Sequence, residues 1–190
     1  MVVAICAGHS IRSPGAVSAG VNERDICRRI VDSASIQGRE RGWTIVDPRS
    51  DTVPLGYPAY LLHRLSVIER AAPDVAVDVH LNAWTDPDTN HSLVVYGDEH
   101  ANSLRSAQCV ANEFADLPWR SQGVRTDADL GRRLAFVRRP TCPSIIVEPL
   151  FLTNPAARSW IGDSDNVDLV ASMIVNGIGR CMCGDGTERT

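Results

Sequence analysis

The chain has 190 residues, which is enough for one domain with a sizeable hydrophobic core. Its formal net charge is −4 and it contains no basic tract, so its composition argues against a nucleic-acid-binding protein. No stretch approaches the roughly 20 apolar residues of a membrane-spanning helix, and a hydrophobic content of 44% is typical of a globular domain.

Segments with the patterns of strands and helices alternate along the chain, without an internal repeat or a linker. Short apolar runs indicate strands, and apolar residues three and four positions apart indicate helices. In chain order, the predicted elements are a strand over 2–7, a helix over 23–41, a strand over 44–46, a helix over 58–72, strands over 75–81 and 93–96, a helix over 101–115, a long polar loop over 117–132, strands over 135–137 and 144–147, and a helix over 165–180.

This alternation predicts an α/β fold, a three-layer αβα sandwich with a mostly parallel, mixed sheet of about six strands. The connection between strands 75–81 and 93–96 is too short for a crossover helix, so we expect strand 93–96 to run antiparallel. Residues 1–183 are expected to form a single domain, and residues 184–190 a polar C-terminal tail.

The amino terminus has neither the basic region nor the long apolar run of a signal peptide, so we expect the chain to be made in the cytoplasm. Its six scattered cysteines are then expected to be buried thiols rather than disulfides. Cys181 and Cys183 form a C-x-C pair, but no second pair stands at the spacing of a zinc ribbon.

Four polar residues stand where a predicted strand ends or a helix begins. His9 follows strand 2–7, His80 lies near the end of strand 75–81, Glu148 follows strand 144–147, and Glu23 starts the first helix. Ligands gather at the carboxyl ends of parallel strands, so all four could meet at one edge of the sheet. Two histidines and one carboxylate form a typical hydrolytic zinc site, and the remaining glutamate could transfer protons.

Each of these residues also has a purely structural interpretation. A histidine after a strand can simply be hydrogen-bonded, and Glu23 is favoured at a helix N-terminus by the helix dipole alone. Glu148 is harder to explain in this way, because the apolar run before it draws a carboxylate towards the core, where it needs a partner or a function. From the residues alone, the metal site and the structural alternative both stay open.

Three sequence blocks resemble the motif blocks of the zinc-dependent N-acetylmuramoyl-L-alanine amidases of the amidase-3 family, in the same order and spacing. The blocks are AGHSIRSPGAVSAGVNE, DVAVDVHLNA and PSIIVEPLFLTNP, and the likeness runs from about Val3 to Asn154. The shorter pieces GHS and HLNA resemble the catalytic domains of bacteriophage endolysins in particular. Two departures stand out: Ala-Gly-His-Ser where many members have Pro-Gly-His-Gly, and Pro149-Leu150 where many have a glycine.

The resemblance implies zinc as the cofactor, His9, Glu23 and His80 as its ligands, and Glu148 as the catalytic residue. It further implies that residues 1–183 form one catalytic amidase domain, which cleaves the amide between N-acetylmuramic acid and L-alanine of the stem peptide. Asn82 could orient a ligand or the substrate, or equally cap a turn. Arg138 stands where the family has a polar residue and could meet peptide carboxylates, or lie with Arg139 in a solvated loop.

The expected partner is peptidoglycan, and neither a nucleic acid nor a membrane span is expected. A phage endolysin that reaches the cell wall after release, with a separate holin if it is phage-encoded, is the leading interpretation. A bacterial autolysin or sporulation amidase and a non-catalytic peptidoglycan-binding relative are the alternatives.

Overall fold

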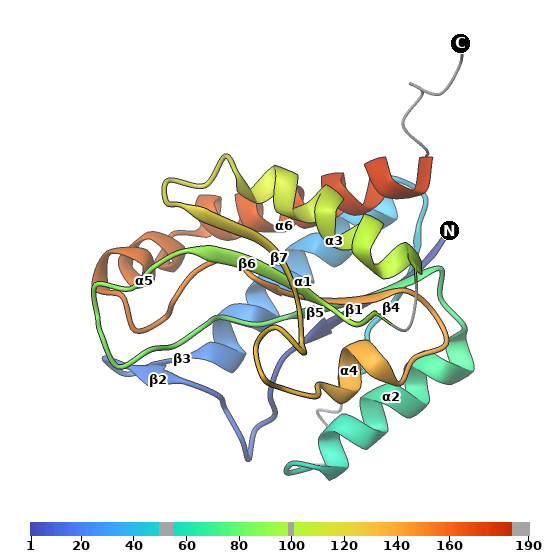
Figure 1. The fold of residues 1–190 in the computed structure, drawn as a ribbon, viewed down its shortest axis with the longest axis horizontal. Coiled ribbons are helices and arrows are strands. Elements are labelled where there is room, and N and C mark those ends of the chain that lie inside the picture. The colour runs from blue at the N-terminus through green and yellow to red at the C-terminus, as the bar shows by residue number, and fades with distance from the viewer. Residues whose placement is uncertain (50–54, 99–100, 184–190) are drawn as a thin grey trace.

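A computed structural model describes residues 1–49, 55–98 and 101–183, so the tail predicted over 184–190 lies outside the described residues. A single sheet runs through the middle of the molecule, with helices on both of its faces (Figure 1). Its strand order is β4-β1-β5-β8-β6-β7. In that order, the strands are Thr44–Val46, Val2–Ala7, Val75–Val79, Ser144–Glu148, Ser92–Tyr96 and Ser121–Thr126.

The sheet is mixed and mostly parallel, as predicted. Strands β4, β1, β5 and β8 run parallel to one another. Strand β6 pairs antiparallel with β8, which confirms the direction expected from the short connection before it, and β7 then runs parallel to β6. Strands β1, β5 and β8 are buried almost throughout, because helices cover both faces of the sheet, and their sequences are correspondingly apolar.

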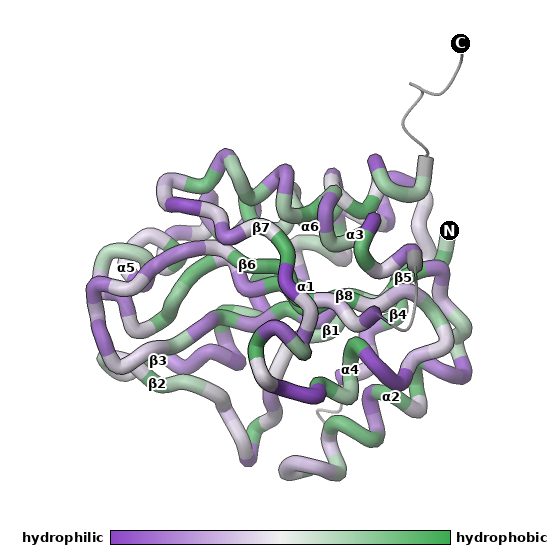
Figure 2. Tube along the Cα trace, in the orientation of Figure 1, coloured by the Kyte–Doolittle hydropathy of each residue, from purple (hydrophilic) through white to green (hydrophobic). Residues whose placement is uncertain are grey.

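The helices divide between the two faces. Helices α1 (Glu23–Glu40), α3 (Ala101–Phe114) and α6 (Ser164–Cys183) cover one face, and α2 (Ala59–Ala71) and α4 (Ala135–Arg138) cover the other (Figure 1). Successive residues of a strand point to opposite faces, so Val3 and Ile5 join the core under α1 and α6, whereas Ala4 and Cys6 join the smaller core under α2 and α4. In Figure 2, apolar and polar residues alternate along α3 and α6, as expected for helices with one buried side.

The strand predicted over 135–137 is wrong: these residues form helix α4. An apolar run of three residues is too short to show a period, and here a backbone hydrogen bond from Val137 to Leu134 closes a helical turn. Phe136 and Val137 then pack into the core below the sheet.

The polar loop predicted over 117–132 is also wrong in part, because it contains β7. This strand lies at the edge of the sheet, and no residue in it is fully buried. An edge strand needs no apolar face, so its polar sequence gave no periodic signal.

Two further elements have no counterpart in the prediction. Helix α5 (Pro155–Gly162) begins after Asn154, whose side chain accepts a hydrogen bond from the Ala157 amide. The two-residue strands β2 (Val17–Ser18) and β3 (Val21–Asn22) form a small hairpin ahead of α1. The other helix boundaries differ from the prediction by no more than three residues. None of the helices in the described part of the chain is long and apolar enough to cross a membrane.

Candidate metal centre and active site

Three neighbouring parallel strands deliver three of the four polar residues to one edge of the sheet. Strands β1, β5 and β8 lie side by side, and their carboxyl ends point the same way. His9 lies two residues beyond β1, His80 directly follows β5, and Glu148 is the last residue of β8. Their convergence therefore follows from the strand order, which the sequence did not specify.

Glu23 comes to the same edge from the start of α1. The side chain of Asn22 caps this helix by accepting a hydrogen bond from the Asp25 amide at 2.9 Å. The Glu23 side chain is 95% buried, and its Oε1 lies 2.9 Å from His9 Nε2 and 3.0 Å from His80 Nδ1. Backbone amides complete the carboxylate's surroundings: Leu81 donates to Oε1 and Ala16 donates to Oε2, each at 3.0 Å.

Two glycines make room for these side chains. A Cβ on Gly8 would lie 2.5–2.7 Å from the His80 ring, and a Cβ on Gly15 would lie 2.4 Å from Glu23 Oε2 and 2.6 Å from the His9 ring. Gly15 also has a φ of +79°, which L-residues with a side chain rarely adopt. His9 itself has a φ of 68°, which is unusual for a residue with a side chain, and its ring contacts Glu23.

The electrostatics of this cluster favour a positive charge between the three side chains. Burial acts to raise the pKa of Glu23, but hydrogen bonds from His80 and His9 hold it well below its usual range. Burial acts to lower the pKa of His80, but the carboxylates of Asp78 and Glu23 raise it to about 10. One ligand atom from each of His9, Glu23 and His80 lies within 4.8 Å of the others. At this spacing, a single metal ion could replace the protons that the histidines share with Glu23.

Glu148 is a buried carboxylate with an unsatisfied oxygen. Its Oε2 has no hydrogen-bond partner among the described residues, and the side chain of Asn82 lines the same pocket. Burial and the nearby charge of Glu23 raise the pKa of Glu148, against the opposing effects of His80, Arg132 and Asn82. A carboxylate that is costly to bury and readily accepts a proton is suited to general-base chemistry.

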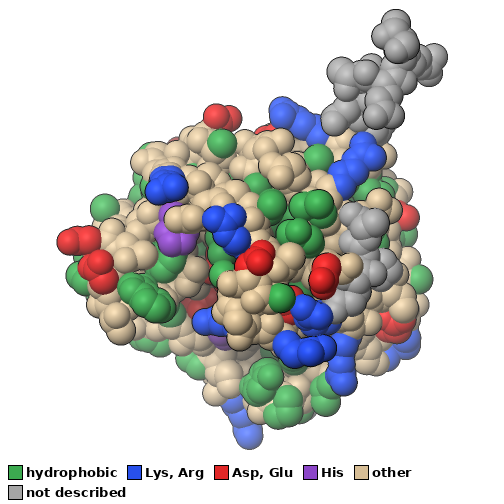
Figure 3. Space-filling view, in the orientation of Figure 1, with side chains coloured by type: hydrophobic (Ala, Val, Ile, Leu, Met, Phe, Trp, Pro, Cys, Tyr) green, Lys and Arg blue, Asp and Glu red, His purple; other side chains and the backbone are tan. Residues whose placement is uncertain are grey.

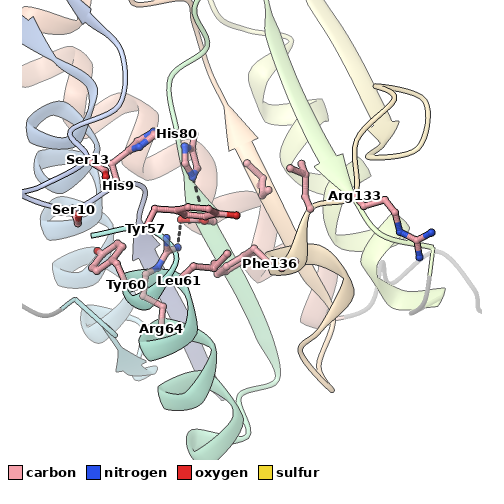
Figure 4. Close-up of a pocket in the computed structure, with 14 residues that line it drawn as sticks. His9, Ser10, Ser13, Tyr57, Tyr60, Leu61, Arg64, His80, Arg133 and Phe136 are labelled. Carbon is pink, nitrogen blue, oxygen red and sulfur yellow. Dashed lines mark hydrogen bonds and ion pairs between the residues drawn. The ribbon is translucent and has the colours of Figure 1, made fainter. Parts of the chain in front are cut away.

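A cleft gives access to the cluster and has two arms that meet at His9 and His80. One arm, of about 400 Å³, also contains Glu23, Asn82, Arg132 and Glu148. The other, of about 390 Å³, is lined by Tyr57, which precedes α2, and by aromatic and aliphatic side chains of α2 and α4, including Tyr60, Leu61 and Phe136 (Figure 4). In the space-filling view, arginine side chains and carboxylates are interspersed over the face of the molecule that is shown (Figure 3).

The two residues expected near the substrate are placed differently from each other. Asn82 lies in the cleft, where it contacts Glu148 and also accepts a hydrogen bond from the Ala83 amide. Arg138 lines neither arm among the described residues, and its guanidinium pairs with the buried carboxylate of Asp127 through atoms 2.5 and 2.6 Å apart. Arg132 is the arginine that lies beside Glu148.

Asp78 and Arg64 were not predicted as site residues. Asp78 Oδ2 lies 3.2 Å from His80 Nε2, and Arg64 hydrogen-bonds to Asp78 Oδ1. The sequence carried one signal for Asp78: it stands two residues before His80, and residues two apart on a strand share a face.

Comparison with known proteins identifies the family. The family model described as Amidase_3, N-acetylmuramoyl-L-alanine amidase, matches residues 3–180. The chain belongs to this amidase family. The resemblance seen in the three sequence blocks is thereby confirmed.

Individual proteins match along nearly the whole chain. A germination-specific N-acetylmuramoyl-L-alanine amidase of Bacillus subtilis is 24% identical, over 91% of this chain and 76% of its own length. The uncharacterized protein YqiI of the same organism is 28% identical, over 93% of this chain and 82% of its own length. Among solved structures, the catalytic domain of the amidase CwlV from Bacillus (Paenibacillus) polymyxa superposes with a TM-score of 0.82 at 24% identity, covering 97% of this chain and 99% of that domain. The fold therefore matches that of the amidase family throughout.

Proposed function

We propose that this amidase hydrolyses the amide between the lactyl group of N-acetylmuramic acid and L-alanine of the stem peptide, with zinc held by His9, Glu23 and His80. The convergence of two imidazoles and a carboxylate beside the unsatisfied Oε2 of Glu148 is the observation that carries this proposal. Nitrogen and carboxylate ligands in a set of three are typical of hydrolytic zinc sites.

An amide resists hydrolysis because its carbonyl is a poor electrophile and its nitrogen a poor leaving group. When bound, zinc supplies Lewis acidity, which acidifies water and polarises the carbonyl. Glu148 takes the proton from the attacking water and passes it to the departing amine, which leaves as the free amino group of L-alanine. Its burial and raised pKa suit this transfer, because the carboxylate then binds the proton more readily between the two steps.

Two other residues of the cleft, Asn82 and Arg132, help to keep Glu148 ionised and to bind the substrate. The Asn82 side chain lowers the pKa of Glu148 and so favours its ionised form, and the backbone of Asn82 is held by hydrogen bonds with Leu150 and Leu152 at 2.9 and 2.8 Å. Arg132 adds a positive charge to the arm of the cleft that contains Glu148. There its guanidinium can bind a carboxylate of the stem peptide.

We further propose that residues 1–183 act as one catalytic domain, supported by the family match over residues 3–180. A phage endolysin is the proposed biological setting, with a bacterial autolysin or sporulation amidase as the alternative. Similar proteins of both kinds occur: besides the germination-specific amidase, the catalytic domain of the CD27L endolysin superposes with a TM-score of 0.77. Expression in a sensitive host with and without a holin separates the two, because an endolysin lyses the culture only when the pore is present.

The activity is tested by digesting purified peptidoglycan and analysing the products by mass spectrometry. The parent protein should release new L-alanine amino termini and leave the glycan strands intact, and a strong chelator should stop the reaction until zinc is added. Glu148→Gln should retain zinc and lose activity by at least the ~100-fold typical of a general base. Glu113→Gln, which alters a carboxylate on α3 that pairs with Arg180 of α6, is the matched control and should remain active. New reducing sugar ends without new L-alanine termini would contradict the proposal.

A further inference from the structure

A chain of buried polar contacts reaches His80 from the side opposite Glu23. The Nδ1 atom of His80 lies 3.0 Å from Glu23 Oε1, and its Nε2 atom lies 3.2 Å from Asp78 Oδ2. Arg64, from α2, hydrogen-bonds to the other oxygen of Asp78. Dashed lines in Figure 4 mark the contacts made by His80 and Arg64. Both nitrogens of the His80 ring are therefore held by protein carboxylates.

The Arg64–Asp78 pair occupies a position where apolar residues would be expected. The side chains of Arg64 and Asp78 are 4% and 3% exposed. In the sheet, Asp78 pairs with Cys6 on one side and Ile146 on the other. Removing two charges from water is costly, and replacing such a buried pair by well-packed apolar residues is often neutral or stabilising. Stability alone is therefore a weak reason for these two residues to be charged.

The surroundings of Arg64 hold it in one place. Its guanidinium lies 5.4 Å from the centre of the Tyr60 ring and 5.2 Å from that of the Phe136 ring, one from α2 and one from α4. Cation–π contacts on two sides restrict the guanidinium, and the guanidinium in turn restricts the carboxylate of Asp78. The packing of α2 and α4 around Arg64 therefore helps to fix the position of Asp78 and, through it, of the His80 ring.

We propose, on the basis of the function assigned above, that Asp78 is a positioning residue for the metal centre and that Arg64 holds it in place. The Asp78 carboxylate accepts a hydrogen bond from Nε2–H of His80, which sets the plane of the ring and leaves Nδ1 as the nitrogen that faces the ion. Arg64 offsets the negative charge of Asp78 within the core. Carboxylates that orient a metal-binding histidine in this way typically raise metal affinity 10- to 100-fold.

The alternative is that the pair only ties α2 to β5. The two roles are separated by the double variant Arg64→Met/Asp78→Val, which replaces the charged pair by apolar residues. Its zinc affinity is measured by competition with a chromogenic chelator, and its stability by urea denaturation. The positioning role predicts a protein at least as stable as the parent whose zinc affinity is about 10- to 100-fold lower. A double variant that binds zinc as tightly as the parent overturns the proposal.

Asp78→Asn provides a second variant that stays close to the native shape. Its single amide oxygen can accept a hydrogen bond from His80 or from Arg64 but not from both, so zinc affinity should again fall. Asp127→Asn is the matched control, because Asp127 is also a buried aspartate paired with an arginine but makes no contact with His80. It should lose stability and keep the zinc affinity of the parent.

The parent protein alone supplies the last test, by NMR of the zinc-loaded form with ¹⁵N-labelled histidine. His80 should carry its proton on Nε2 and bind the ion through Nδ1, and the opposite arrangement overturns the proposal. A parent that binds no zinc contradicts the proposed function itself. A parent and Asp78 variants that bind zinc equally well contradict only the role of Asp78.

Discussion

Gly15 is the position where the shape of the metal centre can be tested most directly. An alanine at this site would adopt a φ of +79°, at a cost of roughly 1–2 kcal/mol. Its Cβ would also lie 2.4 Å from Glu23 Oε2, whereas ordinary contacts begin at 3.4 Å, so the carboxylate would have to move by about 1 Å (3.4 − 2.4). That movement would break the 3.0 Å hydrogen bond from the Ala16 amide and withdraw Glu23 from the two histidines.

Gly20→Ala is the matched control, because Gly20 has a φ of +81° and open space where its Cβ would be. Both variants should lose about 2–8 °C in thermal midpoint, since 1–2 kcal/mol corresponds to 2–4 °C per kcal/mol in a chain of this size. Only Gly15→Ala should also lose zinc affinity, by at least ~10-fold, or about 1.4 kcal/mol. The assay is chelator competition on both variants beside the parent. Equal zinc affinity in Gly15→Ala and Gly20→Ala would refute the reasoning, because it would mean that Glu23 does not have to be where the structure places it.

Three further outcomes follow from the same geometry. Glu23→Gln should weaken zinc binding, because a neutral amide is a poorer ligand than a carboxylate, and an unaltered zinc content on elemental analysis would contradict its role. The pKa of Asp127 is lowered by Arg138, so this carboxylate stabilises the fold above its unfolded pKa of about 3.9 and ceases to do so as the pH falls through its folded pKa. Asp127→Asn should therefore lower the urea midpoint at pH 7, and its difference from the parent should shrink below about pH 4. Ile174→Ala, in the fully buried core, should cost about 2–4 kcal/mol in urea denaturation, whereas Ile36→Ala at an exposed position should change stability by less than about 0.5 kcal/mol.

Helix and strand patterns that span many residues were predicted well, because a long amphipathic pattern is written in consecutive residues. Helix α1 and strand β1 were both predicted within one residue of their observed bounds. Helix α4 and strand β7 were not, since α4 contains only four residues and β7 is stabilised by its neighbour β6 rather than by a pattern of its own. Local sequence cannot show a pairing partner that lies elsewhere in the chain.

The sequence by itself determined the α/β fold class and the amidase resemblance, and it singled out His9, Glu23, His80 and Glu148 as candidate site residues, because periodicity and motif spacing are local properties of the chain. Only the tertiary structure decided how they lie: the order β1-β5-β8 brings three of them to one edge, and Gly15 lets Glu23 approach the histidines. The structure also showed that Arg138 pairs with Asp127. The contact of Asp78 with Arg64 likewise depends on the packing of α2 against the sheet, because a contact across 14 positions exists only after the backbone has folded.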